Sequence, residues 1–279
     1  MTHEHAEPPG PPHPAALASV LQQARAERRT LAPLTDSYPL TMAEAYAVQA
    51  AGTALRLARG EHVVGWKLGY TSQVMRAQMG VAEPNFGPLT DAMLLGSGAV
   101  LRGSALQPRV EPEIGLRLGR RLSGAVSADE ALAACSEAVA CLEVVDSVWT
   151  GYRFRIEDNT ADGSSAAWVV VGPALPMNDL AAVSVSLARN GAVCGSGTGA
   201  DAGGHPAAGL AWLAARLAER GQAVEAGALV ITGGLTAAVP LEPGDEVRGS
   251  FELPRAGVDP VDPVGTNPYA VCSVGRGWT

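Results

Sequence analysis

The chain has 279 residues, of which 47% are hydrophobic and 17% charged, and its formal net charge is −8. This length and apolar content suffice for one large globular domain with a substantial core. The negative charge argues against nucleic acid and anionic membranes as partners, and no apolar run reaches the roughly 20 residues of a membrane span. The low charged fraction predicts that part of the surface is buried in a homo-oligomer.

The cysteines favour a reducing environment. Cys135, Cys141, Cys194 and Cys272 form no C-x-x-C pair, so they indicate neither a zinc site nor a redox motif. No secretory leader opens the chain. We therefore expect a soluble cytoplasmic protein in which these residues act as small core side chains.

The N-terminal quarter is expected to be helical. Residues 1–14 are rich in proline and are expected to form a flexible leader. Residues 15–62 form an N-terminal helical region, with one helix over 15–29 and a second over 42–59. Thr41 and Glu44 have the spacing of a capping box before the second helix, and Gly60 follows its end.

The remaining residues, 63–279, are expected to form a β-rich catalytic domain. Strand patterns recur near 63–69, 93–101, 113–118, 141–146, 167–171, 182–189, 192–195, 228–232 and 246–253, and helices are expected at about 128–140 and 206–220. Loop signals follow the first strand through Gly80, Pro84 and Gly87-Pro88. Asn190-Gly191 and residues 242–245 are typical of tight turns. The glycines at 195–199 fit no phosphate-binding motif and favour a flexible loop. The fold class is therefore α+β with a predominance of β.

Two carboxylates stand two residues apart in the segment 109–118. In an extended strand Glu111 and Glu113 point to the same face, whereas Ile114, Leu116 and Leu118 point to the other. Adjacent like charges repel, and a divalent cation with oxygen ligands such as Mg²⁺ would relieve the repulsion. An exposed strand with an acidic outer face explains the same pattern.

Three further polar features interrupt apolar segments. Glu143 lies in a predicted buried strand and needs a partner, either a metal ion or a basic side chain. Lys67 stands between Trp66 and Leu68, where it could transfer protons or, at a strand end, reach solvent. The polar segment 157–165 could bind a ligand or simply form turns.

The order of several motifs resembles the 2-hydroxypentadienoate hydratase and 4-oxalocrotonate decarboxylase family, in the fumarylacetoacetate hydrolase superfamily. The resemblance covers about residues 40 to 250. It rests on residues 65–72 (GWKLGYTS), 78–81 (QMGV), 86–87 (FG), 107–114 (QPRVEPEI), 142–147 (LEVVDS), 161–162 (AD), 204–206 (GHP) and 232–240 (TGGLTAAVP).

The resemblance implies a fold of rolled and stacked β-sheets and a divalent-metal site. By this resemblance Glu111, Glu113 and Glu143 hold Mg²⁺ or Mn²⁺, Lys67 and Asp91 are catalytic, and Ser165, Thr232, Gly233 and Gly234 contact the substrate. The resemblance also implies a small-molecule 2-oxo acid as the substrate. The ion then acts as a Lewis acid that stabilises a chelated enolate.

Several reactions share this chemistry. The segment 232–240 is more similar to the decarboxylases, which favours decarboxylation of a 4-oxalocrotonate (2-oxo-3-hexenedioate)-like substrate. A 2-hydroxypenta-2,4-dienoate-type hydratase, an enolate-type cyclase or tautomerase of a biosynthetic pathway, and a non-catalytic partner subunit remain alternatives. Decarboxylases and hydratases of this family associate, so a complex with a related enzyme is a further expectation.

The chain also departs from the family pattern. Val148 replaces the arginine that usually follows the Asp-Ser pair, residues 162–165 read Asp-Gly-Ser-Ser, and the tail 267–279 is atypical. If that arginine contacts substrate in the family, substrate choice differs here.

Overall fold

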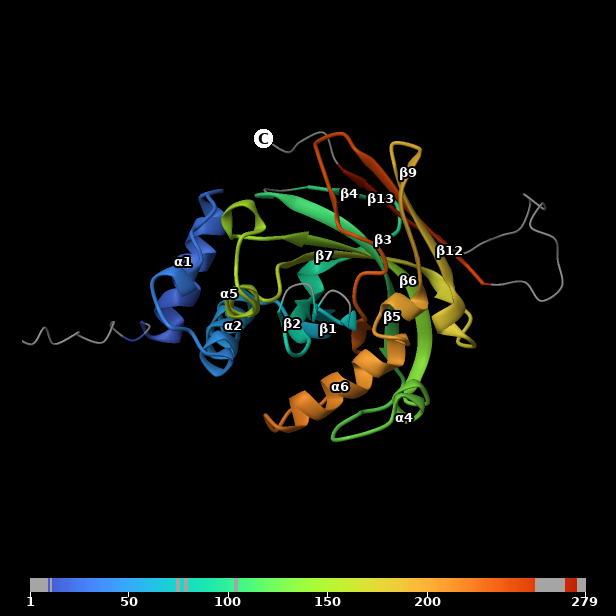
Figure 1. Cartoon of the computed structure of the whole chain (residues 1–279), viewed down its shortest axis with the longest axis horizontal. Coiled ribbons are helices and arrows are strands. Elements are labelled where there is room, and N and C mark those ends of the chain that lie inside the picture. The colour runs from blue at the N-terminus through green and yellow to red at the C-terminus, as the bar shows by residue number, and fades with distance from the viewer. Residues whose placement is uncertain are drawn as a thin grey trace, which may run out of the picture.

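Two mixed β-sheets form the body of the protein, and a group of helices lies at one end of it (Figure 1). The computed structural model describes residues 10, 12–73, 76–77, 80–102, 105–253 and 269–274. The larger sheet is strongly curved and has the strand order β2-β1-β10-β5-β6-β7-β3, with β11 paired to β5. Its strands are β1 (Val63–Gly69), β2 (Asn85–Thr90), β3 (Leu94–Gly96), β5 (Pro108–Leu118), β6 (Cys135–Asp146), β7 (Ala166–Leu175), β10 (Leu229–Ile231) and β11 (Val239–Pro240).

The smaller sheet has the order β4-β13-β12-β8-β9. Its strands are β4 (Ala99–Leu101), β8 (Ser184–Arg189), β9 (Ala192–Thr198), β12 (Glu246–Glu252) and β13 (Tyr269–Val274). The helices are α1 (Pro14–Ala26), α2 (Met42–Leu57), α4 (Ala128–Leu132), α5 (Ile156–Ala161) and α6 (Pro206–Ala218). Short 3-10 turns lie at Leu34–Asp36, Asp91–Met93, Thr150–Tyr152, Leu180–Ala182 and Gly199–Asp201. Among the described residues, no helix has the length and apolar character to cross a membrane.

The two faces of the larger sheet bury different sets of side chains. One face packs against the smaller sheet and α6 and forms the main core, which includes Ile114, Leu116, Leu142, Val144, Leu187, Leu210 and Phe251. On the other face a smaller apolar cluster includes Val139, Cys141, Leu229 and Ile231. Because side chains alternate along a strand, Glu111, Glu113 and Glu143 belong to this second face. Ile114, Leu116 and Leu118 lie on the main-core face, as the sequence predicts.

The N-terminal helices form a third cluster against the body. Leu17 and Leu21 of α1 and Val48 of α2 pack with Val148 and Trp149. The capping box is confirmed, since Thr41 and Glu44 bond reciprocally at the start of α2. The α+β, β-rich architecture with N-terminal helices is therefore confirmed. Most of the expected leader lies outside the described residues, although His13 caps α1, which begins at Pro14.

The expected helix over 128–140 is wrong in its second half. Only Ala128–Leu132 is helical, and β6 begins at Cys135. This strand pairs with β5 from Cys135 to Asp146 and with β7 from Ala138 to Val145. Small apolar residues fit a helix or a strand buried on both faces, and the two neighbouring strands decide between them.

Three other segments differ from expectation. The loop expected through Gly87-Pro88 ends earlier, because residues 85–90 form β2, an edge strand that tolerates Pro88. The expected strand over 93–101 divides between the two sheets as β3 and β4. The expected flexible loop at 195–199 instead continues β9 to Thr198, where Gly197 leaves room for the backbone of Leu235. Within the atypical tail, Tyr269–Val274 is β13 and the rest lies outside the described residues.

Candidate active site

Three carboxylates converge where β5 and β6 pair. In the antiparallel register Glu111 lies directly opposite Glu143, and Glu113 lies opposite Cys141. One oxygen atom from each of Glu111, Glu113 and Glu143 lies within 4.8 Å of the others. Glu113 and Glu143 are fully buried, and Glu111 is half-buried. Hard divalent cations prefer such carboxylate oxygens, so this set could hold Mg²⁺ or Mn²⁺.

The electrostatics of the three carboxylates favour a cation between them. Burial and the nearby Glu143 raise the pKa of Glu111 to about 7, although Lys67 opposes the shift. Burial, Glu143 and Glu111 raise the pKa of Glu113 well above its usual value. Within the described chain, Glu113 Oε1 and Glu143 Oε1 are buried and accept no hydrogen bond. Buried charges are costly without partners, so the donor set fits a divalent cation.

Lys67 is the cation that the fold places among these carboxylates. It comes from β1, and its Nζ lies 3.1 Å from Glu143 Oε2 and donates to the backbone oxygen of Ser164 at 3.1 Å. Burial alone would lower the pKa of Lys67, but Glu143, Glu113 and Glu111 outweigh it and the pKa is raised. The alternative prediction, in which Lys67 reaches solvent at a strand end, is wrong because Lys67 is 3% exposed.

The segment 232–234 closes the site from the β10 side. Thr232 is buried and its hydroxyl donates to Ile114 O at 2.9 Å, which ties the segment to β5. Gly233 N donates to Glu113 Oε2 at 2.7 Å. A side chain at Gly234 would collide with the carboxylate of Glu111. These three residues therefore position the carboxylates, and their contact with substrate stays a prediction.

The turn between α5 and β7 supplies a second group of polar side chains. Ser164 and Ser165 are both nearly buried and both have left-handed φ values of 57°. Ser165 Oγ accepts from Asn159, and Ser164 Oγ donates to Asn85 Oδ1 at 3.1 Å. Consecutive left-handed serines are strained and are typical of functional sites. The fold thus brings Ser165 near Lys67, although its role in substrate binding stays a prediction.

Asn85 contacts the serine turn beside Lys67 and was not singled out by the sequence, whereas Ser164 belongs to the polar segment 157–165 that was. Asn85 is fully buried and donates to Asn159 and Thr160 at 2.9 Å each. It pairs with Gly69 in the β1–β2 ladder, two positions from Lys67 and on the same face. The available signal was weak, because a single asparagine before Phe86-Gly87 in an expected loop indicates little by itself.

Asp91 is not brought together with Lys67. It follows β2, whose Gly87 pairs with Lys67, so the extended strand carries Asp91 to the opposite end of β1. There its exposed carboxylate accepts from His62 N at 3.0 Å and from Ala92 N at 2.9 Å. The resemblance places this aspartate in a loop after Phe86-Gly87, but β2 continues to Thr90 and leaves no direct contact between Asp91 and Lys67.

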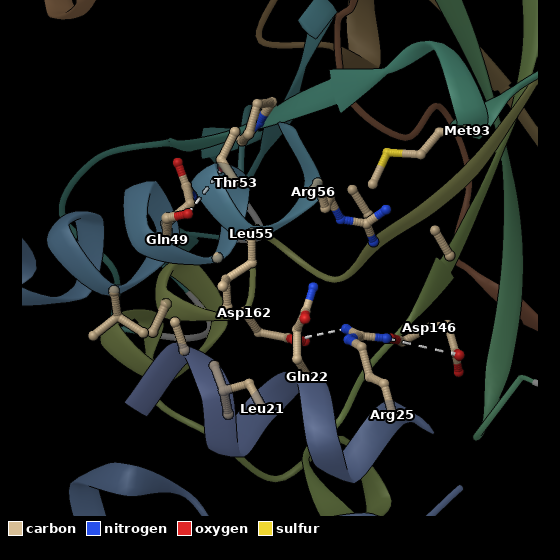
Figure 2. A pocket seen from close by; sticks show the side chains of 18 of the residues that line it. Leu21, Gln22, Arg25, Gln49, Thr53, Leu55, Arg56, Met93, Asp146 and Asp162 are labelled. Atoms are coloured by element: carbon tan, nitrogen blue, oxygen red, sulfur yellow. Dashed lines mark hydrogen bonds and ion pairs between the residues drawn. The ribbon is translucent and has the colours of Figure 1, made fainter. Parts of the chain in front are cut away.

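A cavity of about 670 Å³ lies behind the serine turn, between α1, α2 and the body (Figure 2). At its wall Arg25 of α1 donates to Asp162 Oδ1 at 2.6 Å and to the backbone oxygen of Asp146 at 2.9 Å. These contacts tie the end of β6 to the turn that carries Ser164 and Ser165. Val148, the departure from the family pattern, is buried among the N-terminal helices, and its N–H donates to Asp162.

Known proteins are similar to this chain in sequence and in architecture. The family model described as "Fumarylacetoacetate (FAA) hydrolase C-terminal" matches residues 60–258. A 2-hydroxyhexa-2,4-dienoate hydratase of Comamonas testosteroni is 39% identical over 235 residues, which cover 81% of this chain and 88% of that protein. A 4-oxalocrotonate decarboxylase of Pseudomonas sp. (strain CF600) is 37% identical over 243 residues, which cover 85% of this chain and 92% of that protein.

A solved structure extends the likeness to the whole fold. The 4-oxalocrotonate decarboxylase from Pseudomonas putida G7, complexed with magnesium and adipate, has a TM-score of 0.84 and 31% identity. The alignment covers 93% of this chain and 96% of that chain. With these relatives and the carboxylate cluster together, the chain belongs to the fumarylacetoacetate hydrolase family, as a metal-dependent lyase of its hydratase and decarboxylase group.

Proposed function

We propose that this protein is a Mg²⁺- or Mn²⁺-dependent decarboxylase of a 2-oxo acid of the 4-oxalocrotonate (2-oxo-3-hexenedioate) type. The observation that carries the proposal is the convergence of Glu111, Glu113 and Glu143 beside the buried Lys67. The relative that is complexed with magnesium and adipate supports it, because adipate is also a six-carbon dicarboxylate.

The proposed ligands are these three carboxylates. A bound divalent ion would supply Lewis-acid stabilisation of the negative charge that develops on the 2-oxo group. Gly233 N holds Glu113 in place, and the lack of a side chain at Gly234 leaves room for Glu111. We propose the backbone of this segment and Ser165 as substrate contacts.

Decarboxylation breaks the bond between C5 and the distal carboxyl carbon. The electron pair moves along the conjugated chain to the oxygen on C2, and a proton then completes 2-hydroxypenta-2,4-dienoate beside the released CO₂. Lys67 is a charged donor among the carboxylates, so we assign it the delivery of that proton. Asp91, which lies beyond the far end of β1, has no part in this step.

A hydratase is the second candidate. The specific support is that a 2-keto-4-pentenoate hydratase of Burkholderia vietnamiensis is 40% identical over 227 residues, which cover 79% of this chain and 87% of that protein. The same groups would then protonate a dienol before water adds to the distal carbon. We also propose that the protein forms a homo-oligomer and that it associates with a related hydratase or decarboxylase.

The mass of the product separates these reactions. Purified protein is incubated with Mg²⁺ or Mn²⁺ and either 2-oxo-3-hexenedioate or 2-hydroxypenta-2,4-dienoate, and the product is identified by mass spectrometry. We expect the six-carbon substrate to lose CO₂. Gain of water by the five-carbon substrate alone would establish the hydratase instead, and an unchanged mass with a new structure would indicate a cyclase or tautomerase. Inertness toward a broad panel of 2-oxo acids would contradict the catalytic proposal and favour a partner subunit.

A further inference from the structure

An arginine continues the row of carboxylates on β5. Arg109, Glu111 and Glu113 occupy alternate positions of the strand, so their side chains leave the same face. The β5–β6 register is regular here, with Arg109 opposite Val145 and Glu111 opposite Glu143. Arg109 therefore stands about 7 Å along the strand from Glu111, with no bulge to turn it away.

The guanidinium of Arg109 is available to a ligand. Within the described residues it forms no ion pair and no side-chain hydrogen bond, unlike Arg25, which is held by Asp162. Its Cζ instead lies 4.0 Å from the ring centroid of Tyr152. Tyr152 is fixed in turn, because its hydroxyl donates to Val145 O at 3.1 Å and accepts from Ser147 N at 3.4 Å. Stacking on the fixed ring of Tyr152 therefore orients the guanidinium of Arg109 and leaves its N–H groups free to bind a ligand.

The exposure of the side chains along β5 shows from which end of the strand a ligand can reach the carboxylates. Glu113 is fully buried, whereas Glu111 and Arg109 are both half-buried. The row of side chains thus becomes more accessible from Glu113 toward Arg109. A chain-like ligand anchored at the three carboxylates would extend in this direction and meet Arg109 first.

We infer that Arg109 is the residue that binds the distal carboxylate of a dicarboxylic 2-oxo acid. The inference rests on the proposed function, in which the 2-oxo end lies at Glu111, Glu113 and Glu143. An extended six-carbon diacid holds its two carboxyl carbons about 6 Å apart, which matches the spacing of alternate strand residues. Guanidinium and carboxylate form paired, charge-assisted hydrogen bonds that a monocarboxylic ligand cannot make at its apolar end.

This contact selects the substrate and does not speed the chemical step. Decarboxylation moves negative charge from the distal carboxylate toward the 2-oxo group, so Arg109 stabilises the bound substrate at least as well as the transition state. Loss of the guanidinium should therefore raise KM for 2-oxo-3-hexenedioate about tenfold or more and leave kcat unreduced.

The test compares two ligands that differ only at the distal end. 2-Oxohexanedioate and 2-oxohexanoate share the 2-oxo acid group, and neither has the double bond that the proposed decarboxylation requires. Calorimetry in the presence of Mg²⁺ gives Kd for both with the wild-type protein, Arg109→Gln and Arg153→Gln. Arg153 is exposed beside Tyr152, so Arg153→Gln removes the same charge nearby and serves as the matched control.

We expect the wild-type protein and Arg153→Gln to bind the diacid about ten to a hundred times more tightly than the monoacid. Arg109→Gln should weaken the diacid alone and bring the ratio close to one. An equal loss for both ligands, or an unchanged ratio, would overturn the inference. If Arg109→Gln does not fold, Arg109→Lys replaces it in the test. We then expect a several-fold loss of affinity for the diacid alone, because lysine cannot form the paired contact.

The outcomes also separate this inference from the proposed function. Equal binding of both ligands by the wild-type protein would contradict the role of Arg109 but would still agree with a 2-oxo acid site at the three carboxylates. Binding of neither ligand, with Mg²⁺ still bound, overturns the 2-oxo acid site and the role of Arg109 with it. If the wild-type protein binds the diacid more tightly than the monoacid but releases no CO₂ from 2-oxo-3-hexenedioate, the result supports the role of Arg109 in binding and contradicts the proposed decarboxylase activity.

Discussion

Lys67 is one positive charge among three negative ones, and this imbalance gives it a double role. Its ammonium group offsets part of the repulsion between the carboxylates and would also compete with a divalent ion for Glu143. We expect Lys67→Met to reduce turnover by about 10²–10⁴-fold, the range of a lost proton donor. The same variant should bind Mg²⁺ at least as tightly as the wild-type protein, because the competing cation is gone. Initial rates and calorimetric Mg²⁺ titration measure the two effects.

Asp91→Asn is the control for this variant. The carboxylate of Asp91 is exposed beside His62 at the far end of β1, so its loss should change kcat by no more than about twofold. A large loss of kcat in Asp91→Asn, equal to that of Lys67→Met, would contradict the assignment of proton transfer to Lys67 alone.

Arg25 connects elements that are distant in sequence. From α1 it binds Asp162, whose side chain is 1% exposed, and it also contacts Asp146 at the end of β6. Removing one partner of a buried ion pair leaves an uncompensated charge, so Arg25→Gln should lower the free energy of unfolding by about 3 kcal/mol. Urea denaturation monitored by circular dichroism measures this change.

The matched control is Arg29→Gln, just after the same helix. Arg29 pairs with Glu27 near the surface, and both side chains are almost half exposed, so its loss should cost at most about 0.5 kcal/mol. Similar values for Arg25→Gln and Arg29→Gln would show that α1 does not depend on the buried contact.

The sequence predicts those elements that local rules determine. The capping box at Thr41 and Glu44 and the turn at Asn190-Gly191 are confirmed because their geometry depends on neighbouring residues alone. The second half of the helix expected over 128–140 and the end of the loop expected through Gly87-Pro88 are wrong, because pairing with distant strands decides both segments. Local periodicity does not contain that information.

The same division holds for the candidate site. The i, i+2 spacing alone predicts that Glu111 and Glu113 share a face, and the structure bears this out. Their approach to Glu143 depends on the β5–β6 register, which only the motif order of the family suggested. The polar segment 157–165 includes Ser164, but Asn85 could not be predicted, because its place near Lys67 follows from β2 and the serine turn packing together.

A divalent ion at the buried carboxylates would stabilise the whole molecule. Five segments meet at the site: β1, β5, β6, the turn at 163–165 and the segment at 232–234. An ion that binds only the folded chain stabilises all of them at once, by about 2.7 kcal/mol when its concentration is a hundred times Kd. Removing the ion with a chelator should therefore lower the temperature of unfolding of the entire protein.

The most direct test of the metal centre is Mg²⁺ and Mn²⁺ titration of the wild-type protein, Glu113→Gln and Glu137→Gln, by calorimetry and by thermal unfolding. Glu137 lies on β6 with a partly exposed side chain that pairs with Arg117, so Glu137→Gln makes the same substitution away from the site. We predict one ion per chain and a rise in the unfolding temperature for the wild-type protein and Glu137→Gln, with neither effect in Glu113→Gln. Binding and stabilisation that are the same in Glu113→Gln as in the wild-type protein would contradict the three-carboxylate centre.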